Sequence, residues 1–341
     1  MFEIDSYIKR FDANKVDVLE NGKFPYVVRM GSNNGQKGFI NEDETYLNEG
    51  NTISFGQDTA TMFYQEKPYF TGDKIKIVRA KDKRFSKKNA QFFISTMMKS
   101  FSSFSWGSSS FSVGIIKDQK VTLPTINGEI DFEFMESFLA ELEAERIAKL
   151  EAYLSATELK DYTLTPKEEQ ALADYENGKV KFGEFAYKSI FNNIAQGRRL
   201  KKDDQISGNI PFVMAGVTNT GVVNYISNPV ASFPGNSITI DIFGNTFYRD
   251  YDFGAGDDTG VYWSNEKSYS KEAMLFFTAS MEKSLFGKFS YGKKLRSSQS
   301  LDFKMNLPTQ DQQPNFDIMA TLISAVQKLV IKDVVLYAEK K

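Results

Sequence analysis

The chain has 341 residues, of which 41% are hydrophobic and 25% charged, and its formal net charge is −2. It contains no His and no Cys, which excludes thiol nucleophiles, Ser-His catalysis and thiolate or imidazole zinc sites. No apolar run approaches the roughly 20 residues of a membrane span, and the N-terminus has no signal pattern. We therefore expect a globular protein with room for two cores, located in the cytoplasm and without a membrane partner.

Short strand patterns fill the first part of the chain. The stretch FPYVVR (residues 24–29) predicts a strand, and NNGQKGFI (33–40) predicts a glycine turn that opens into another. In NTISF (51–55), apolar and polar residues alternate as they do in half-buried strands. The stretch KNAQFFISTMMKSF (88–101) predicts an amphipathic helix. Residues 1–128 are thus expected to form a small α+β domain.

A long apolar-periodic segment follows at 129–156, entered from Leu123-Pro124 through a short polar loop. About 24 helical residues give a rod of about 36 Å. Its apolar stripe includes the following residues: Phe134, Phe138, Leu142 and Leu150. The connecting segment 157–179 contains Thr165-Pro166 followed by two glutamates, which predicts a capped helix start.

The second part of the chain repeats the first at a shift of about 185 residues. GNIPFV (208–213) aligns with GKFPYV, NTGVVNYI (219–226) with NNGQKGFI, and MLFFTASMEKS (274–284) with AQFFISTMMKS. Leu307-Pro308 then leads into a second long helix at 313–341, with a stripe formed by Ile318, Leu322, Val326 and Leu329. The order of the matches never breaks, so the chain is a tandem duplication whose second domain spans 180–312.

The two long stripes allow two interpretations. They can bury each other as a coiled-coil-like pair, or each helix can pack on its own domain. We favour pairing, because a 36 Å rod is longer than a globule of about 100 residues.

The ordered motifs carry a resemblance to a known family. GRRLKKDDQISGNIPFVMAG (197–216), NTGVVNYI, GNSITIDIFGNTFYR (235–249) and the late Leu-Pro helix resemble the specificity subunit of type I restriction-modification systems. The first half matches the same template, so the resemblance covers nearly the whole chain. Each motif alone is weak, but the ordered set occurring twice is specific. The short chain is also similar to the S subunit of type IIB systems, and the sequence does not separate the two.

The resemblance implies an α+β fold with two tandem target-recognition domains, separated by two long helices that pair as an antiparallel coiled coil. Each domain would read one half of a bipartite site in double-stranded DNA. The helices would set the gap and dock methyltransferase subunits that modify adenine N6 and that are either separate from the nuclease or fused with it. The chain itself would be non-catalytic and without a cofactor, with S-adenosylmethionine and Mg²⁺ expected on the partner subunits.

Basic runs in the two domains favour phosphate contact, although a charge run is more often a solvated face. The candidates for DNA contact in these runs are Lys74, Arg84, Lys87, Lys88, Arg198, Arg199, Lys201, Lys202, Lys293, Lys294 and Arg296. Base contacts are expected where aligned loops diverge, since two domains of one fold would read different bases. These candidates are Arg29, Asn34, Gln65, Thr220, Asn245 and Arg249.

Other interpretations remain open. DFGAGDDTG (252–260) contains a Gly-Ala-Gly-Asp stretch, but no clear helix follows, so we predict a hairpin loop and no nucleotide site. The alternatives for the whole chain are a two-domain scaffold that binds protein, and an enzyme with an Asp/Glu/Lys site. Turnover by the isolated chain would favour the enzyme, and salt-insensitive binding to duplex DNA, or no such binding, would favour the scaffold.

Overall fold

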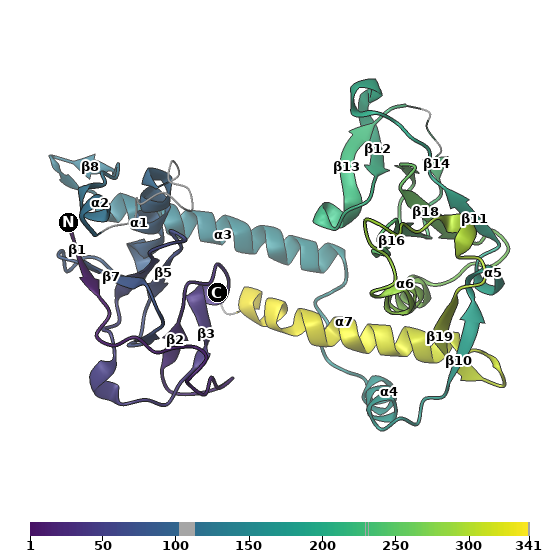
Figure 1. Cartoon of the computed structure of the whole chain (residues 1–341), viewed down its shortest axis with the longest axis horizontal. Coiled ribbons are helices and arrows are strands. Elements are labelled where there is room, and N and C mark those ends of the chain that lie inside the picture. The colour runs from purple at the N-terminus through teal and green to yellow at the C-terminus, as the bar shows by residue number, and fades with distance from the viewer. Residues whose placement is uncertain (102–112, 229, 231, 340–341) are drawn as a thin grey trace. The chain divides into compact units, whose positions relative to one another are not determined.

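The computed structural model describes residues 1–101, 113–228, 230 and 232–339. The chain divides into two compact units, unit 1 (Met1–Leu150) and unit 2 (Glu151–Lys341), which are described one at a time (Figure 1).

Unit 1 contains a larger and a smaller sheet. The larger sheet is antiparallel with strand order β1-β7-β4-β5, the smaller has order β3-β2-β6, and β8 pairs with β9 in a short ribbon. Its strands are β1 (Phe2–Ser6), β2 (Pro25–Val27), β3 (Gln36–Phe39), β4 (Thr52–Gly56), β5 (Met62–Gln65), β6 (Phe70–Thr71), β7 (Ile75–Ala80), β8 (Thr125–Ile126) and β9 (Glu129–Ile130). Its helices are α1 (Lys87–Ser100), α2 (Val113–Asp118) and most of α3 (Phe132–Ala156).

Unit 2 repeats these two sheets. Strand order β11-β18-β15-β16 corresponds to β1-β7-β4-β5, and β13-β12-β17-β14 corresponds to β3-β2-β6 with one strand added. A third sheet, β10-β19-β20, precedes the last helix. The elements are α4 (Pro166–Glu176), β10 (Phe182–Ala186), α5 (Tyr187–Ile190), β11 (Asn193–Gln196), β12 (Ser207–Val213), β13 (Val222–Ile226), β14 (Ser232–Phe233), β15 (Ser237–Asp241), β16 (Thr246–Arg249), β17 (Phe253–Ala255), β18 (Thr259–Trp263), α6 (Lys271–Leu285), β19 (Lys304–Gln310), β20 (Gln313–Pro314) and α7 (Phe316–Glu339). The predicted duplication of one α+β module is therefore confirmed.

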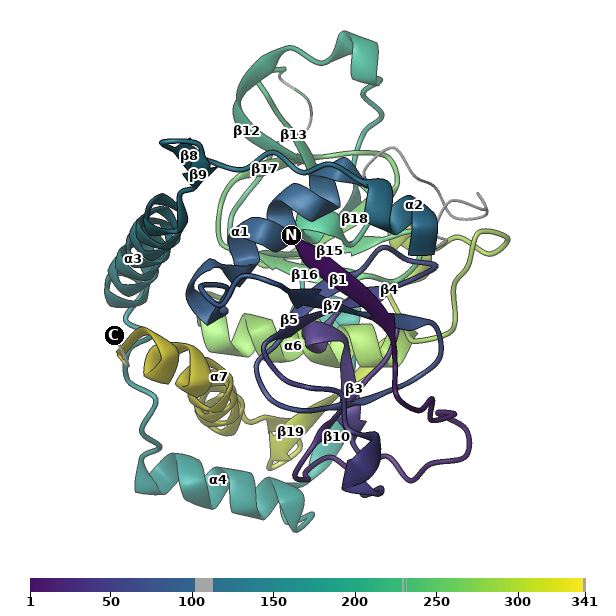
Figure 2. The same cartoon turned by 90° about the vertical axis from the view of Figure 1, so that its left-hand side faces the viewer.

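One helix covers the larger sheet in each unit. In unit 1 the apolar face of α1 packs with the inward residues of β4, as Phe93 and Ile94 meet Ile53 and Phe55 in one buried cluster. In unit 2, α6 packs beside β15 and β16 (Figure 2). Helix α1 is capped by Ser86, whose capping box with Asn89 satisfies free amides of its first turn. These cores hold the strand ends in place.

The chain crosses between the two sheets at the same point in both units. Strands β6 and β17 run parallel to β2 and β12 in the smaller sheets, whereas the strands that follow them, β7 and β18, belong to the larger sheets. The prediction of a hairpin at 252–260 is therefore wrong. The residues between the two strands form a crossover loop, because the chain passes directly from one sheet to the other.

The long helices begin inside their own units and continue as single uninterrupted helices (Figure 1 and Figure 2). Met135 of α3 and Met319 of α7 are completely buried in the cores of unit 1 and unit 2 respectively. Helix α4 begins at the predicted Thr165 cap with Pro166 in its first turn, and it packs against α7. None of the helices that the structure describes is both long and apolar enough to cross a membrane. The pairing of α3 with α7 stays a prediction.

Candidate nucleic-acid interface

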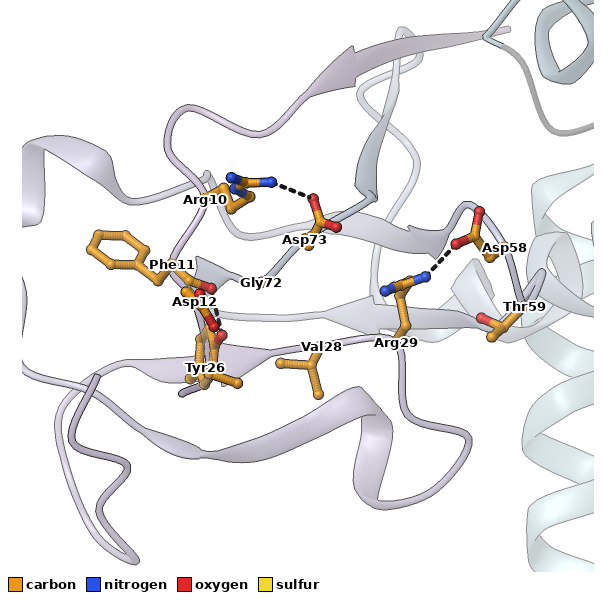
Figure 3. Close-up of a pocket in the computed structure, with 11 residues that line it drawn as sticks. Arg10, Phe11, Asp12, Tyr26, Val28, Arg29, Asp58, Thr59, Gly72 and Asp73 are labelled. Carbon is orange, nitrogen blue, oxygen red and sulfur yellow. Dashed lines mark hydrogen bonds and ion pairs between the residues drawn. The ribbon is translucent and has the colours of Figure 1, made fainter. Parts of the chain in front are cut away.

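A hollow of about 460 Å³ opens where the two sheets of unit 1 meet (Figure 3). Its wall is built by the crossover loop after β6, by the end of β2, by the β4–β5 turn and by the segment before β2. The residues that line it are Arg10, Phe11, Asp12, Ala13, Tyr26, Val28, Arg29, Asp58, Thr59, Gly72 and Asp73. A Cβ at Gly72 would lie 3.0 Å from Val28 Cγ1, so a larger residue here would have to displace that side chain. The crossover thus brings loops from four parts of the sequence around one space.

Ion pairs at the protein surface hold the cations of this hollow. Arg10 Nη1 lies 3.2 Å from Asp73 Oδ1, and Arg29 pairs with Asp58. Lys74, just outside the lining, places Nζ 2.9 Å from the same Asp58 Oδ2. Exposed pairs of this kind contribute about 0–1 kcal/mol each. These pairs therefore add little stability, and the donors that they leave unused can meet a ligand.

Unit 2 has a hollow of about 580 Å³ at the equivalent place. In unit 1 the amide of Gly72 donates to Val27 O at 2.8 Å, and in unit 2 that of Gly256 donates to Val213 O at the same distance. The segments that precede the smaller sheets correspond as well. Phe11 N donates to Thr71 O at 2.9 Å, and Arg198 N donates to Ala255 O at 2.8 Å. Both hollows are therefore built on the same backbone frame, which these equivalent main-chain hydrogen bonds define.

The side chains on this shared frame differ. Both hollows contain an aspartate from the crossover loop, Asp73 in unit 1 and Asp257 in unit 2. The second hollow then adds three exposed cations with no ion pair among the described residues: Arg199, Lys201 and Lys202. Equal backbones with unequal charges are what two domains of one fold require if each reads a different DNA sequence.

Gln65 and Arg249 do not face solvent, so the prediction that they contact bases is wrong. They are 4% and 1% exposed. Gln65 Nε2 donates to Asn34 O at 3.1 Å and to Ser54 Oγ at 3.0 Å. Arg249 donates to the equivalent pair of atoms, Thr220 O and Thr239 Oγ1, the latter at 3.1 Å. Two different side chains thus hold the same turn onto the same strand.

The polar side chains of the neighbouring turns are also engaged locally. Asn34 has φ +53° and donates from Nδ2 to Tyr64 O at 3.0 Å. Thr220 has φ +51°, and its Oγ1 accepts from Arg249 at 2.9 Å. Asn245 is half-buried and donates to Asp241 Oδ2 at 2.7 Å. Asn34 and Thr220 remain exposed at the turn surface, whereas the amide group of Asn245 stabilises its own turn.

The predicted basic residues fall into separate places. Arg29, Arg199, Lys201 and Lys202 line the hollows. Lys74 joins the first hollow through Asp58, and Arg296 joins the second by donating to Asp257 O. The remaining candidates are exposed elsewhere, before β12, at the start of α1 or in the loop after α6: Arg198, Arg84, Lys87, Lys88, Lys293 and Lys294.

Several cations outside the hollows have partners of their own. Arg84 lies 2.7 Å from Asp82 and 4.4 Å above the ring of Phe132, and Lys87 lies 2.9 Å from Glu66. Lys294 lies over the Tyr291 ring at 4.8 Å. These contacts leave the charges at the surface, where they can still meet phosphates.

The sequence did not predict three residues that form ion pairs in the first hollow: Arg10, Asp58 and Asp73. Asp73 could have been predicted from the sequence, because the aligned TGD and AGD stretches place an aspartate at the same point of both modules. No sequence pattern pointed to Arg10 or Asp58. Asp58 lies in the β4–β5 turn, which is one residue longer than its counterpart in unit 2.

The two long helices present apolar residues to solvent. Phe134, Phe138 and Leu142 of α3 are 49%, 45% and 38% exposed. On α7, Val326 and Leu329 are exposed, while Ile318 and, on α3, Leu150 are half-buried. Leu322, a predicted residue of the interface between the long helices, is 5% exposed, so its side chain is already covered. It sits in a groove that α4, α6 and α7 line within unit 2.

Acidic clusters do not suggest a metal centre. Among the residues that the structure describes, no group of three or more His, Cys, Asp or Glu side chains is placed to hold a metal ion.

Comparison with known proteins agrees with this geometry. The family model of the type I restriction modification DNA specificity domain matches residues 1–152 and again residues 179–335. The specificity subunit S.BcgI of a type II restriction enzyme of Heyndrickxia coagulans is 27% identical over 330 residues, which cover 95% of this chain and 91% of that protein. The crystal structure of a type I restriction-modification system S subunit from M. genitalium has a similar fold, with a TM-score of 0.60 and 14% identity over 99% of this chain and 89% of that one.

Proposed function

The chain belongs to the type I restriction modification DNA specificity family, and from this premise we propose that it reads a bipartite site in double-stranded DNA, one half with each unit. The observation that carries the proposal is the pair of hollows, which share a backbone frame and differ in charge. Phosphate contacts from the surrounding cations would hold each unit on the duplex, and side chains in the hollow would meet base edges.

The long helices would set the distance between the half-sites and dock methyltransferase subunits. Their exposed apolar residues support this role, because such residues are stabilised when another helix covers them. We propose that α3 and α7 pair antiparallel, leaving outer faces for partners that are separate from the nuclease or fused with it. This chain would be non-catalytic and would act in the cytoplasm. The partners would supply S-adenosylmethionine, Mg²⁺ and the transfer of a methyl group to N6 of a flipped adenine.

The test is a map of methylated bases in cells that express the chain together with its methyltransferase partner. We expect two short blocks of fixed sequence, separated by an unspecified gap, with methyladenine in each. A continuous motif would show that the units do not read separate half-sites.

A protein-binding scaffold is separated from this proposal by salt titration. Binding of the purified complex to duplex DNA should weaken steeply as salt rises, because cations on phosphates release counterions when they bind. An affinity for duplex DNA that does not change with salt concentration, or no DNA binding at all, would contradict the DNA-reading role.

A further inference from the structure

Arg29 is held by one end of its guanidinium. It follows β2 by two residues, and Nη1 donates to Asp58 Oδ2 across the hollow of unit 1. Figure 3 shows one end of the guanidinium turned to Asp58 and the other turned away from it. In the described part of the chain the guanidinium has no second hydrogen-bond or ion-pair partner. Its side chain is 32% exposed. The remaining donors are therefore available to a ligand that enters the hollow.

A plainer role for Arg29 is to tie the β4–β5 turn to the end of β2. Unit 2 makes the same tie without an arginine, because Gly216 N donates to Asp241 Oδ2 at 3.1 Å and Ala215 stands at the position of Arg29. The junction can thus be closed by a backbone amide. Closing this junction therefore does not explain why unit 1 has an arginine that reaches into the hollow.

Asp58 gives the arginine a fixed direction. A carboxylate on one edge of a guanidinium restricts its rotation, so the opposite edge loses less entropy when it binds. Asp58 also repels the phosphate backbone, which makes a phosphate a poor replacement for a base edge. Lys74 shares the same carboxylate oxygen at 2.9 Å, but an ammonium is a point charge that can move to a phosphate without altering Arg29.

We propose, on the basis of the function proposed above, that Arg29 braced by Asp58 reads a guanine in the half-site of unit 1. Guanine presents O6 and N7 in the major groove, and a guanidinium edge matches this pair of acceptors with two parallel hydrogen bonds. Asp58 is the positioning residue, and it acts through Arg29. The half-site of unit 2 has no counterpart of this reader, because Ala215 replaces the arginine.

The experiment compares methylation motifs of the complete complex for Arg29→Ala, Arg29→Lys, Asp58→Asn and the unchanged protein. Arg29→Ala should make one guanine position of one half-site degenerate, with discrimination falling about 5- to 150-fold, since a bidentate pair is worth roughly 1–3 kcal/mol. Arg29→Lys should relax the same position, because an ammonium cannot form the paired contact. Asp58→Asn should relax it to a smaller degree.

The half-site read by unit 2 is the internal control and should stay unchanged in every variant. Lys74→Ala is the matched control for Asp58→Asn, because Lys74 is the other cation that pairs with Asp58. It should weaken DNA binding through a lost phosphate contact and leave the methylated motif unchanged. Uniformly lower methylation with an unchanged motif would show a purely structural role and overturn the inference. A half-site without any guanine sensitive to Arg29 would also overturn it. Failure of the proposed function would look different, because the unchanged protein would then give no split motif.

Discussion

At the scale of single residues, burial separates side chains that stabilise their own unit from side chains that a ligand can reach. Gln65 and Arg249 diverge between the modules, which suggested base contact, yet both are buried and bond the same carbonyl of an equivalent turn. Arg29 diverges too, but its free edge faces the hollow. Divergence between the modules therefore indicates a candidate for base contact only when the side chain is also exposed.

Arg249→Ala should destabilise unit 2 and leave the base preference of any residual activity unchanged. The guanidinium donates to Thr220 O, Thr220 Oγ1, Thr239 Oγ1 and Tyr251 Oη, and its loss removes all four bonds and leaves a hole beside the buried Thr239. We expect a loss of about 2–4 kcal/mol in the free energy of unfolding. Urea denaturation measures it, with exposed Arg198→Ala as the control that should change stability by less than about 0.5 kcal/mol. Equal stability of both variants would refute the structural role.

At the scale of elements, α4 makes the two long helices unequal. Glu168 of α4 accepts a hydrogen bond from Ser324 Oγ at 2.6 Å and one from Lys328 Nζ at 3.0 Å. On α3 the aligned residues are Ala140 and Ala144, and both are exposed. Helix α7 is therefore held by α4, whereas the equivalent face of α3 is exposed.

The contact of α4 with α7 should make unit 2 sensitive to acid. Burial opposes ionisation of Glu168, but hydrogen bonds from Ser324, Thr165 and Lys328 together outweigh it and lower its pKa to about 2, from 4.5. Because the folded pKa is depressed, the stabilisation is present above about pH 4.5 and is lost as the pH falls towards 2. Urea midpoints measured between pH 6 and pH 3 should fall more for the unchanged protein than for Glu168→Gln. Exposed Glu169→Gln is the control, and its midpoint should follow the unchanged protein.

The start of α3 and its exposed stripe should respond differently to truncation. Met135 is completely buried in the core of unit 1, so Met135→Ala should cost about 2–5 kcal/mol of stability. Phe138 is 45% exposed, and Phe138→Ala should cost less than about 1 kcal/mol. Phe138→Ala should, however, reduce the amount of methyltransferase that copurifies with the chain. Normal assembly of Phe138→Ala would show that this part of the stripe is not an interface.

At the scale of the whole molecule, two units that share a frame and differ in their hollows fit a protein that reads two sequences at a set distance. The helices leave the cores of their own units and carry exposed apolar residues. The distance between half-sites would then depend on helix length, whereas the bases would depend on the hollows. These two properties should be separable by mutation.

Insertion of one heptad into both α3 and α7 should lengthen the gap and preserve the bases read in each half-site. Seven helical residues add about 10 Å, which corresponds to about three base pairs of duplex. The methylation map measures the gap directly. A heptad inserted into one helix alone is the control, and it should abolish methylation because the stripes no longer match. An unchanged gap in the double insertion would exclude the helices as the ruler.

The sequence by itself determined the duplication, the main strands, the amphipathic helices and the Thr165 helix start, because local periodicity and capping depend on neighbours along the chain. Only the tertiary structure decided which side chains meet. Asp58 pairs with Arg29 across the hollow of unit 1, and Gln65 and Arg249 are buried where a turn is bonded to their strand. Leu322 is buried by packing within unit 2. Such contacts join residues far apart in sequence, and no local pattern records them.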